Sequence, residues 1–494
     1  MRRLFFIAAL ATATLVFAGT SLRKWEEARR QFDKTFKDRK ATASDKRKAV
    51  KMLAELDDFR AVRHLLREAM DDDEFSVRRA AFRGIADRTT DVRAMGEVVK
   101  AAKGERSPEK RYVLARLAAG FAGKCPSVKR LLLGWVKDRD WRFRALCARY
   151  LGRYKEPDAV SKLEWLVKKD VNRRVRFLAA RSLLACGRDE KTLPEDLRKE
   201  EDDSFLFMPA FLQTDSLAIL IDASNDMDVE MALPKSDIIE RLREMRKESE
   251  EAPKRRPRRP PRKGPQKPPT KEEKEARYRS NFVVSRIEYA KKKALALIKS
   301  LPQGVTVRVY MVSAGLRMSE AVKLGDERQM QKFETWLRKQ DTKPGRDWLL
   351  AMKKVFADET VDTVLVIGCG APHISEIDDP GEFISWLEEK NFSRGVRIFT
   401  AVLLADYAAA GLSRPQEIVR AQRVNAISDF FARFAKVGGG TRGMLDHVGK
   451  VPIPKVSVEP EKKPSDEEKP EEKPEEKSGK DSDAGKPEKE SSGE

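Results

Sequence analysis

Apolar residues between residues 21 and 197 recur at helical spacing, in units that resemble one another. Small residues sit beside them, as at Ala80–Ala81 and Ala179–Ala180, and let helices approach closely. One helix pair cannot bury its own apolar face, so we predict stacked helix pairs over this region. The recurring apolar positions, 31 to 35 residues apart, are Val77, Tyr112, Phe143 and Val175.

The pattern changes near Asp215, where continuous apolar runs replace the helical period. Such runs are typical of strands that are buried on both faces of a parallel sheet. Helical stretches alternate with them, which predicts a doubly wound α/β domain over residues 213–448, with a parallel sheet and helices on both faces. The runs lie at 216–221, 305–312, 363–367 and 396–404, and the helical stretches at 284–300, 327–339, 348–356, 382–390 and 427–436.

The N-terminal segment has the composition of an export signal. Arg2 and Arg3 precede an apolar run, Leu4–Ala18, and small residues follow at once. A run of about 15 apolar residues is short for a bilayer span, which needs about 20. We therefore predict a signal peptide over residues 1–18 and a periplasmic or extracellular chain. An uncleaved segment that anchors the chain in the membrane is the alternative.

Charge and proline mark two further segments. The 494 residues carry a formal net charge of +21. Residues 243–279 interrupt the α/β pattern with proline and basic residues, and residues 454–494 hold almost nothing apolar. We expect both to be disordered. The basic stretch 254–263 suits an acidic polymer or an anionic membrane surface, or serves solubility alone. Export argues against nucleic acid as the partner, although the net charge by itself would favour it.

The helical units resemble the HEAT repeat. In Asp73–Ala86, for example, acidic residues lead through Val77-Arg78 into an Ala-rich helix. The resemblance implies an α-solenoid over residues 21–197 that binds protein partners, with the helix at 25–36 as its cap. A generic helical bundle is the alternative.

Arginines recur near the start of one helix in each unit, and they admit two interpretations. They form a basic ridge that binds an acidic partner, or they bond neighbouring repeats through Asp73, Asp140 and Asp170. We favour the second interpretation for Arg78, Arg144 and Arg176. The arginines concerned are Arg78, Arg79, Arg83, Arg142, Arg144, Arg173, Arg174 and Arg176.

The α/β region resembles the von Willebrand factor type A domain. Its first apolar run leads into Asp222-Ala223-Ser224-Asn225-Asp226, where that family has Asp-x-Ser-x-Ser. The resemblance implies a metal-ion-dependent adhesion site at the carboxyl ends of the strands. There a divalent cation such as Mg²⁺ binds hydroxyl and carboxylate oxygens from three loops.

The adhesion motif is degenerate in this chain. Asp222 and Ser224 match the first loop, but Asp226 replaces its second Ser, and Arg346 takes the Thr position of the second loop. Cys369 takes the Asp position of the third loop. A guanidinium repels a metal ion but pairs well with carboxylates. We hypothesise that Arg346 replaces the metal through an internal ion pair and that no cofactor binds. The rival is a rearranged Mg²⁺ site that uses Asp222, Ser224, Asp226 and Asp347.

Catalytic motifs are sparse in the rest of the chain. The four cysteines are not spaced as zinc ligands, and we interpret them as core residues, with a disulfide between adjacent repeats left open. A nucleophilic pair of Cys369 and His373 is conceivable but has no evident orienting partner. We therefore expect a non-catalytic interaction scaffold. A membrane-tethered envelope protein and a metal-dependent adhesion protein are the alternatives. The partner and the oligomeric state are not specified by the sequence.

Overall fold

The computed structural model describes residues 22–56, 58–88, 91–198, 212–233, 283–373, 375–404 and 414–445, with residues 209, 237, 239, 240 and 243. The predicted signal peptide, the tail and all of the insertion except Arg243 lie outside these residues. Within the described ranges, no helix has the length and apolar character needed to span a membrane.

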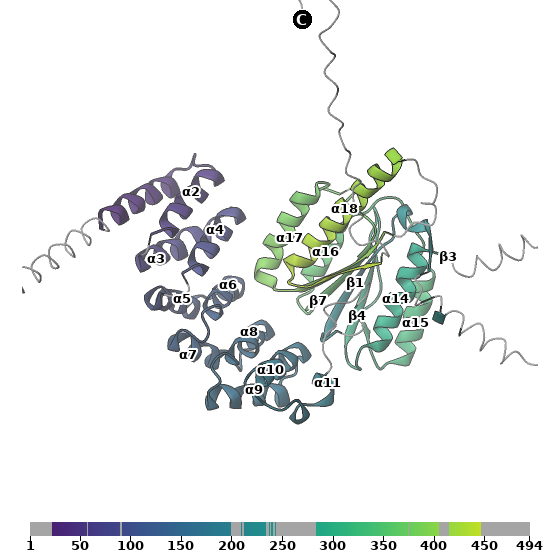
Figure 1. Cartoon of the computed structure of the whole chain (residues 1–494), viewed down its shortest axis with the longest axis horizontal. Coiled ribbons are helices and arrows are strands. Elements are labelled where there is room, and N and C mark those ends of the chain that lie inside the picture. The colour runs from purple at the N-terminus through teal and green to yellow at the C-terminus, as the bar shows by residue number, and fades with distance from the viewer. Residues whose placement is uncertain are drawn as a thin grey trace, which may run out of the picture. The chain divides into compact units, whose positions relative to one another are not determined.

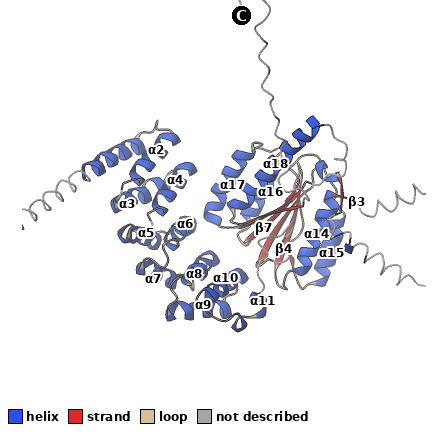
Figure 2. Cartoon of the chain, in the orientation of Figure 1, coloured by secondary structure: helices blue, strands red, loops and turns tan. Residues whose placement is uncertain are grey.

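The first part of the described chain is helical throughout (Figures 1 and 2). Helices two apart in the chain pack on each other: α2, α4, α6, α8 and α10 in succession, and likewise α3, α5 and α7. This two-layer stacking confirms the predicted helix pairs. A helix over residues 22–37 comes first. The others are α2 (Ala43–Ala54), α3 (Phe59–Arg67), α4 (Phe75–Ala86), α5 (Val92–Gly104), α6 (Pro108–Ala119), α7 (Pro126–Trp135), α8 (Trp141–Leu151), α9 (Pro157–Lys169), α10 (Arg173–Ala185) and α11 (Glu195–Arg198).

The helix boundaries follow from capping residues. Asp140 and Asn172 accept hydrogen bonds from backbone N–H groups in the first turns of α8 and α10, and proline occupies the first turn of α6, α7 and α9. Small residues set the spacing between successive helices of one layer. A Cβ added at Gly84 of α4 would lie 2.6 Å from Cβ of Ala54 in α2, so only glycine permits this approach.

A ladder of ion pairs links successive repeats. Each rung joins a basic residue in one helix to an acidic residue 26 or 27 positions later. The acidic side chain also accepts a hydrogen bond from the backbone N–H two residues further on, which fixes the inter-repeat turn. The rungs are Lys46–Asp72 at 2.7 Å, Arg111–Asp138 at 2.6 Å and Arg144–Asp170 at 2.7 Å.

The ladder confirms one of the predicted arginine contacts and revises the others. Arg144 binds Asp170 as expected. Arg78 binds Asp73 only through its backbone carbonyl, at 2.7 Å. Arg176 lies 3.7 Å from Asp196, and Asp140 pairs with Arg142 two residues away instead of with another repeat. The helix N-cap role of Asp140 explains this, because its carboxylate already points back into α8.

The second part of the described chain is an α/β domain around a seven-stranded sheet (Figure 2). The strand order is β5-β4-β1-β7-β8-β9, with β6 also paired to β4. The prediction of a purely parallel sheet is wrong at one edge, where β5 and β6 run antiparallel to β4. These two strands have only two residues each, too few to show a pattern. The parallel strands are β1 (Ser216–Asp222), β4 (Thr306–Val312), β7 (Thr363–Gly368), β8 (Arg397–Leu403) and β9 (Arg442–Leu445); β5 is Arg317–Met318 and β6 is Val322–Lys323.

Helices cover both faces of the sheet, as the continuous apolar runs predicted. Ile219 and Ile221 of β1 face the core beneath α14 and α15, whereas Ala218 and Leu220 face the core beneath α16, α17 and α18. The helices are α14 (Arg286–Ser300), α15 (Glu327–Arg338), α16 (Trp348–Ala357), α17 (Pro380–Arg394) and α18 (Arg414–Val437). A separate antiparallel pair, β2 (Glu230–Ala232) and β3 (Val283–Ser285), precedes α14.

Two carboxylates, the partly buried Asp215 and the buried Asp362, join the last full repeat to the amino end of the sheet. Asp215 accepts a hydrogen bond of 2.6 Å from the backbone N–H of Arg173, at the start of α10. Its own N–H donates to Asp362, whose carboxylate also accepts from Thr214. Burial, together with the negative charge of Asp362, raises the pKa of Asp215 to about 6.

Breaking the ladder should destabilise the repeats. Arg144→Met leaves the Asp170 carboxylate, only 1% exposed, without its cation. We expect the free energy of unfolding in urea to fall by about 3 kcal/mol. Adding Asp170→Asn should restore a large part of the loss, because no uncompensated charge then remains buried. Arg139→Met, on an exposed neighbour, is the matched control; an equal loss there would contradict the ladder.

Asp215 should make stability fall with increasing pH. Its pKa is about 6 when folded and near 3.8 as a free group, so the folded state holds the proton more tightly between those values. Stability from this group is therefore present at pH 4 and lost as the pH passes 6. Relative to Asp215→Asn, the wild type should lose on the order of 1 kcal/mol between pH 4 and 7 in urea denaturation. Parallel pH profiles would contradict this assignment.

Candidate functional site

The carboxyl ends of β1 and β7 hold the residues that the sequence singled out. Asp222 is the last residue of β1, and its carboxylate is fully buried. One oxygen accepts a 3.0 Å hydrogen bond from the N–H of Ser224, which folds the following loop back over the strand. Ser224 is also buried, so the first loop presents two oxygen-bearing side chains inward.

The second loop is pinned from both sides before it enters α16. Ser224 and Lys343 form a parallel bridge, and Arg346 and His373 form an antiparallel bridge with N–H···O distances of 2.9 and 3.0 Å. Gly345 adopts a φ of +80°, a conformation that glycine takes without strain. The backbone therefore delivers the side chain of Arg346 to the interior instead of to solvent.

Arg346 fills the centre of the site. Its Nε donates to Oδ2 of Asp222 at 2.6 Å, and its Nη2 donates to Ser224 at 2.8 Å and to Asp226 at 2.9 Å. Its Nη1 donates to the carbonyl of Ala371 at 2.9 Å. Every guanidinium nitrogen thus has an oxygen partner, and the residue is only 4% exposed.

The negative groups around Arg346 keep its guanidinium protonated. Burial by itself lowers the pKa of Arg346, but the nearby Asp222, Cys369 and Asp226 outweigh it and raise the pKa above its usual value. The guanidinium therefore stays charged. Among the described residues, no group of three or more His, Cys, Asp or Glu side chains is arranged to hold a metal ion. The oxygens that would coordinate a cation are bonded to Arg346.

Two of the remaining candidate residues lie at the margin. Asp226 is about half exposed and has a second cation, Arg423, at 4.0 Å. Asp347 points elsewhere: its carboxylate accepts from the N–H of Leu350 at 2.8 Å and caps α16. The sequence placed Asp347 among the candidate ligands, whereas the structure assigns it to the helix start.

Cys369 lies beside the ion pair and has a poorly ionised thiol. Its Sγ is 3.5 Å from Asp222 and 3.6 Å from Nη2 of Arg346. Burial, reinforced by the Asp222 charge, raises the pKa of the thiol far above its ordinary value. A nucleophilic cysteine needs the opposite shift. The side chain of His373 is exposed, and the contact of His373 with the site runs through its backbone.

The three other cysteines, Cys125, Cys147 and Cys186, are also free thiols, so no disulfide joins adjacent repeats within the described residues.

Sequence reasoning missed two supports of Arg346. A Cβ added at Gly370 would lie 2.1 Å from Nη1, so the absence of a side chain there makes room for the guanidinium. Trp348, fully buried, donates from its ring nitrogen to the carbonyl of Gly370 at 3.1 Å and holds this turn in place. The run Gly368-Cys369-Gly370 was a visible signal of close approach, but the approaching group could not be inferred from it.

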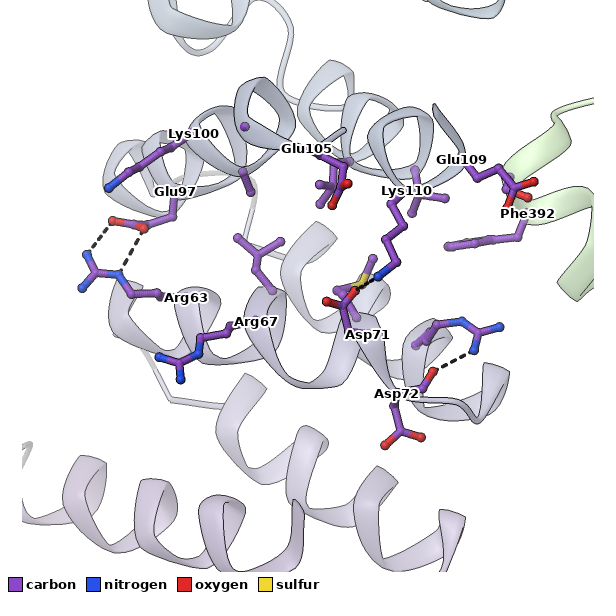
Figure 3. Close-up of a pocket in the computed structure, with 18 of the residues that line it drawn as sticks. Arg63, Arg67, Asp71, Asp72, Glu97, Lys100, Glu105, Glu109, Lys110 and Phe392 are labelled. Atoms are coloured by element: carbon purple, nitrogen blue, oxygen red, sulfur yellow. Dashed lines mark hydrogen bonds and ion pairs between the residues drawn. The ribbon is translucent and has the colours of Figure 1, made fainter. Parts of the chain in front are cut away.

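A separate cleft of about 800 Å³ is lined mainly by α3, α5 and α6 of the repeats, with Glu389, Phe392 and Ser393 of α17 at one side (Figure 3). Arg63 and Glu97 form a two-pronged ion pair across it, with a shortest distance of 2.7 Å, and Lys110 reaches Asp71 at 2.8 Å. Apolar residues such as Leu66 and Val113 form part of its wall. Apolar surface between paired charges is a combination suited to binding a protein segment.

Comparison with known proteins supports the repeat assignment. A sequence profile of HEAT repeats matches residues 95–184, which spans α5 to α10. No curated protein matches the chain. The HEAT match indicates a protein-interaction scaffold, because stacked helical repeats of this kind mediate protein contacts.

Removing the central cation should destabilise the α/β domain. Arg346→Met leaves Asp222 charged and fully buried without a cation, which should cost about 3–5 kcal/mol in urea unfolding. The double variant Arg346→Met/Asp222→Asn should recover much of that loss. Arg423→Met removes the exposed cation near Asp226 and should cost less than about 0.5 kcal/mol. Equal costs for Arg346→Met and Arg423→Met would contradict the central role of Arg346.

Proposed function

We propose that this chain is an exported, non-catalytic scaffold for protein interactions. In this proposal a HEAT-type solenoid is joined to a type A-like domain whose adhesion site holds arginine in place of a metal ion. The observation that carries it is the set of contacts made by Arg346, which binds Asp222, Ser224 and Asp226 together.

The resemblance to a type A domain is supported by the meeting of three loops. The loop after β1, the loop before α16 and the loop after β7 converge on Arg346, as the three loops of the family converge on a metal ion. β1 and β7 are adjacent in the sheet, so their carboxyl ends open on the same side. The type A site would then be a fixed structural feature instead of an ion-dependent switch.

The interaction role is supported by the cleft in the repeats and by the HEAT profile match. The basic stretch 254–263 offers a second contact for an acidic polymer or an anionic membrane surface. The N-terminal pattern supports export. A chemical role for the α/β domain is disfavoured by the buried, poorly ionised thiol of Cys369.

Calorimetric titration with Mg²⁺, Mn²⁺ and Ca²⁺ tests the proposal. The wild-type chain should release no binding heat at millimolar metal. The variant Arg346→Thr/Cys369→Asp removes the cation and supplies two oxygen ligands beside Asp222 and Ser224. It should bind Mg²⁺ with a Kd on the order of 0.1–1 mM, because a divalent ion prefers such an oxygen set.

Arg346→Met is the matched control, since it removes the cation without adding an oxygen ligand; it should gain little metal affinity. Micromolar Mg²⁺ binding by the wild type that disappears in Asp222→Ala would overturn the metal-free site and favour a metal-dependent adhesion protein.

A further inference from the structure

One arginine-rich edge of the repeats contacts α17. Nη2 of Arg78 lies 3.0 Å from Glu389, and Arg79 pairs with Glu388. Further along the repeats, Arg116 of α6 donates to the carbonyl of Phe392 at 2.8 Å, and Arg142 of α8 donates to the carbonyl of Ser393 at 2.8 Å. We call this set the arginine ridge: Arg78, Arg79, Arg116 and Arg142.

The contacted end of α17 has a defined chemistry. The helix ends at Arg394, with Gly395 in the left-handed conformation, so the last carbonyls lack helical N–H partners. These carbonyls form the negative end of the helix dipole, and two adjacent glutamates add full charges. Phe392 supplies an apolar contact, with its ring centroid 5.6 Å from that of Phe75 and 5.2 Å from that of Phe82. The ridge thus contacts a helix end that carries two glutamates, terminal carbonyls and an aromatic residue, with Arg394 as the basic residue of the last turn.

Arg78 occupies a ladder position but pairs with Glu389 of α17 instead of with an acidic residue of the repeats. Like Arg144, it donates from Nη1 to the two carbonyls five and six residues before it. Arg144 turns its other edge to Asp170, the acidic residue 26 positions later. The equivalent of Asp170 in the repeat of Arg78 is Glu105, which accepts from the N–H of Ser107 at 2.7 Å as the ladder acids do.

The ladder position of Arg78 is therefore open in this structure. Its outer edge binds Glu389 of α17, while Glu105 lies on the wall of the cleft without a cation from the ladder. Figure 3 shows Glu105 among the labelled residues of that wall. Arg78 thus has two carboxylates available, one in α17 and one in its own repeat. Its pair with Glu389 is partly exposed, at 24% and 37%, so water and competing anions can reach it.

We propose that the arginine ridge is a docking surface for an acidic helix C-terminus of a partner protein, and that α17 occupies it in cis until the partner displaces it. When α17 leaves, Arg78 closes the ladder onto Glu105. The ladder contact lowers the cost of release, because the guanidinium is never left unpaired. This inference rests on the proposed interaction role and names the partner surface for it.

A fluorescently labelled peptide of residues 380–394, the sequence of α17, tests the proposal in trans against the full-length chain. The wild type should bind it weakly, because its own α17 competes. Glu388→Gln/Glu389→Gln in the chain weakens the resident contact and should raise the peptide affinity about tenfold in anisotropy titrations. Adding Arg78→Ala/Arg79→Ala should reduce that gained affinity at least tenfold.

Two controls separate recognition from general charge attraction. Arg106→Ala removes an exposed arginine for which the structure shows no partner among the described residues, and it should leave peptide binding unchanged. A peptide with glutamine at both glutamate positions should lose binding.

No peptide binding by the Glu388→Gln/Glu389→Gln chain, or equal binding with and without Arg78 and Arg79, would overturn the docking surface. Either result is independent of the metal titration, which reports only on the strand-end site.

Discussion

The arrangement of the α/β domain depends on one buried positive charge. Arg346, from the loop before α16, carries a fixed cation into the point where three loops meet, and the loops after β1 and β7 turn oxygens toward it. Without that charge, Asp222 would be a buried carboxylate with no cation beside it, which costs several kcal/mol. A side-chain cation also differs from an ion in a basic respect: it is covalently attached and cannot be exchanged, chelated or left open to a ligand. The oxygens of these loops are consequently bonded within the protein and are not available to an external ligand.

In the repeats, buried or partly buried carboxylates are likewise paired with cations, and the same pair recurs from one repeat to the next. In three inter-repeat turns an acidic residue accepts from the backbone N–H two residues ahead and pairs with a cation 26 or 27 residues behind. The helices alone would tolerate several crossing angles, because apolar packing has little directional preference. The paired charges have a preferred geometry, and they therefore favour one orientation of each helix relative to the next. Where a rung is left open, at Arg78, the cation contacts another part of the chain. Structural and recognition arginines therefore differ in their partners and not in their sequence context.

Much of this could be read from the sequence because it depends on local order. The apolar runs placed β1, β4, β7 and β8 within one or two residues, and the alignment of loop motifs brought Asp222, Ser224 and Arg346 to one site. Contacts that depend on distant partners could not be read. The sequence around Asp347 fits a ligand and a helix cap equally well, and the cap depends on the orientation of α16. The need for glycine at position 370 could not be predicted, because it depends on the guanidinium of Arg346 packing against that backbone. The pairing of Arg78 with a residue 311 positions away had no local signal.

The small β2–β3 pair has a consequence for how the chain can vary. Ala232 and Val283 are register partners, so the two ends of the intervening fifty residues are hydrogen-bonded neighbours. For a loop whose ends are held together, added chain costs about 0.6 kcal/mol of closure entropy for each doubling in length. The pairing of β2 with β3 therefore keeps the distance between the two ends of this segment constant. Segments of very different length and charge could be installed at this position in related chains while the sheet and its strand-end site keep their geometry.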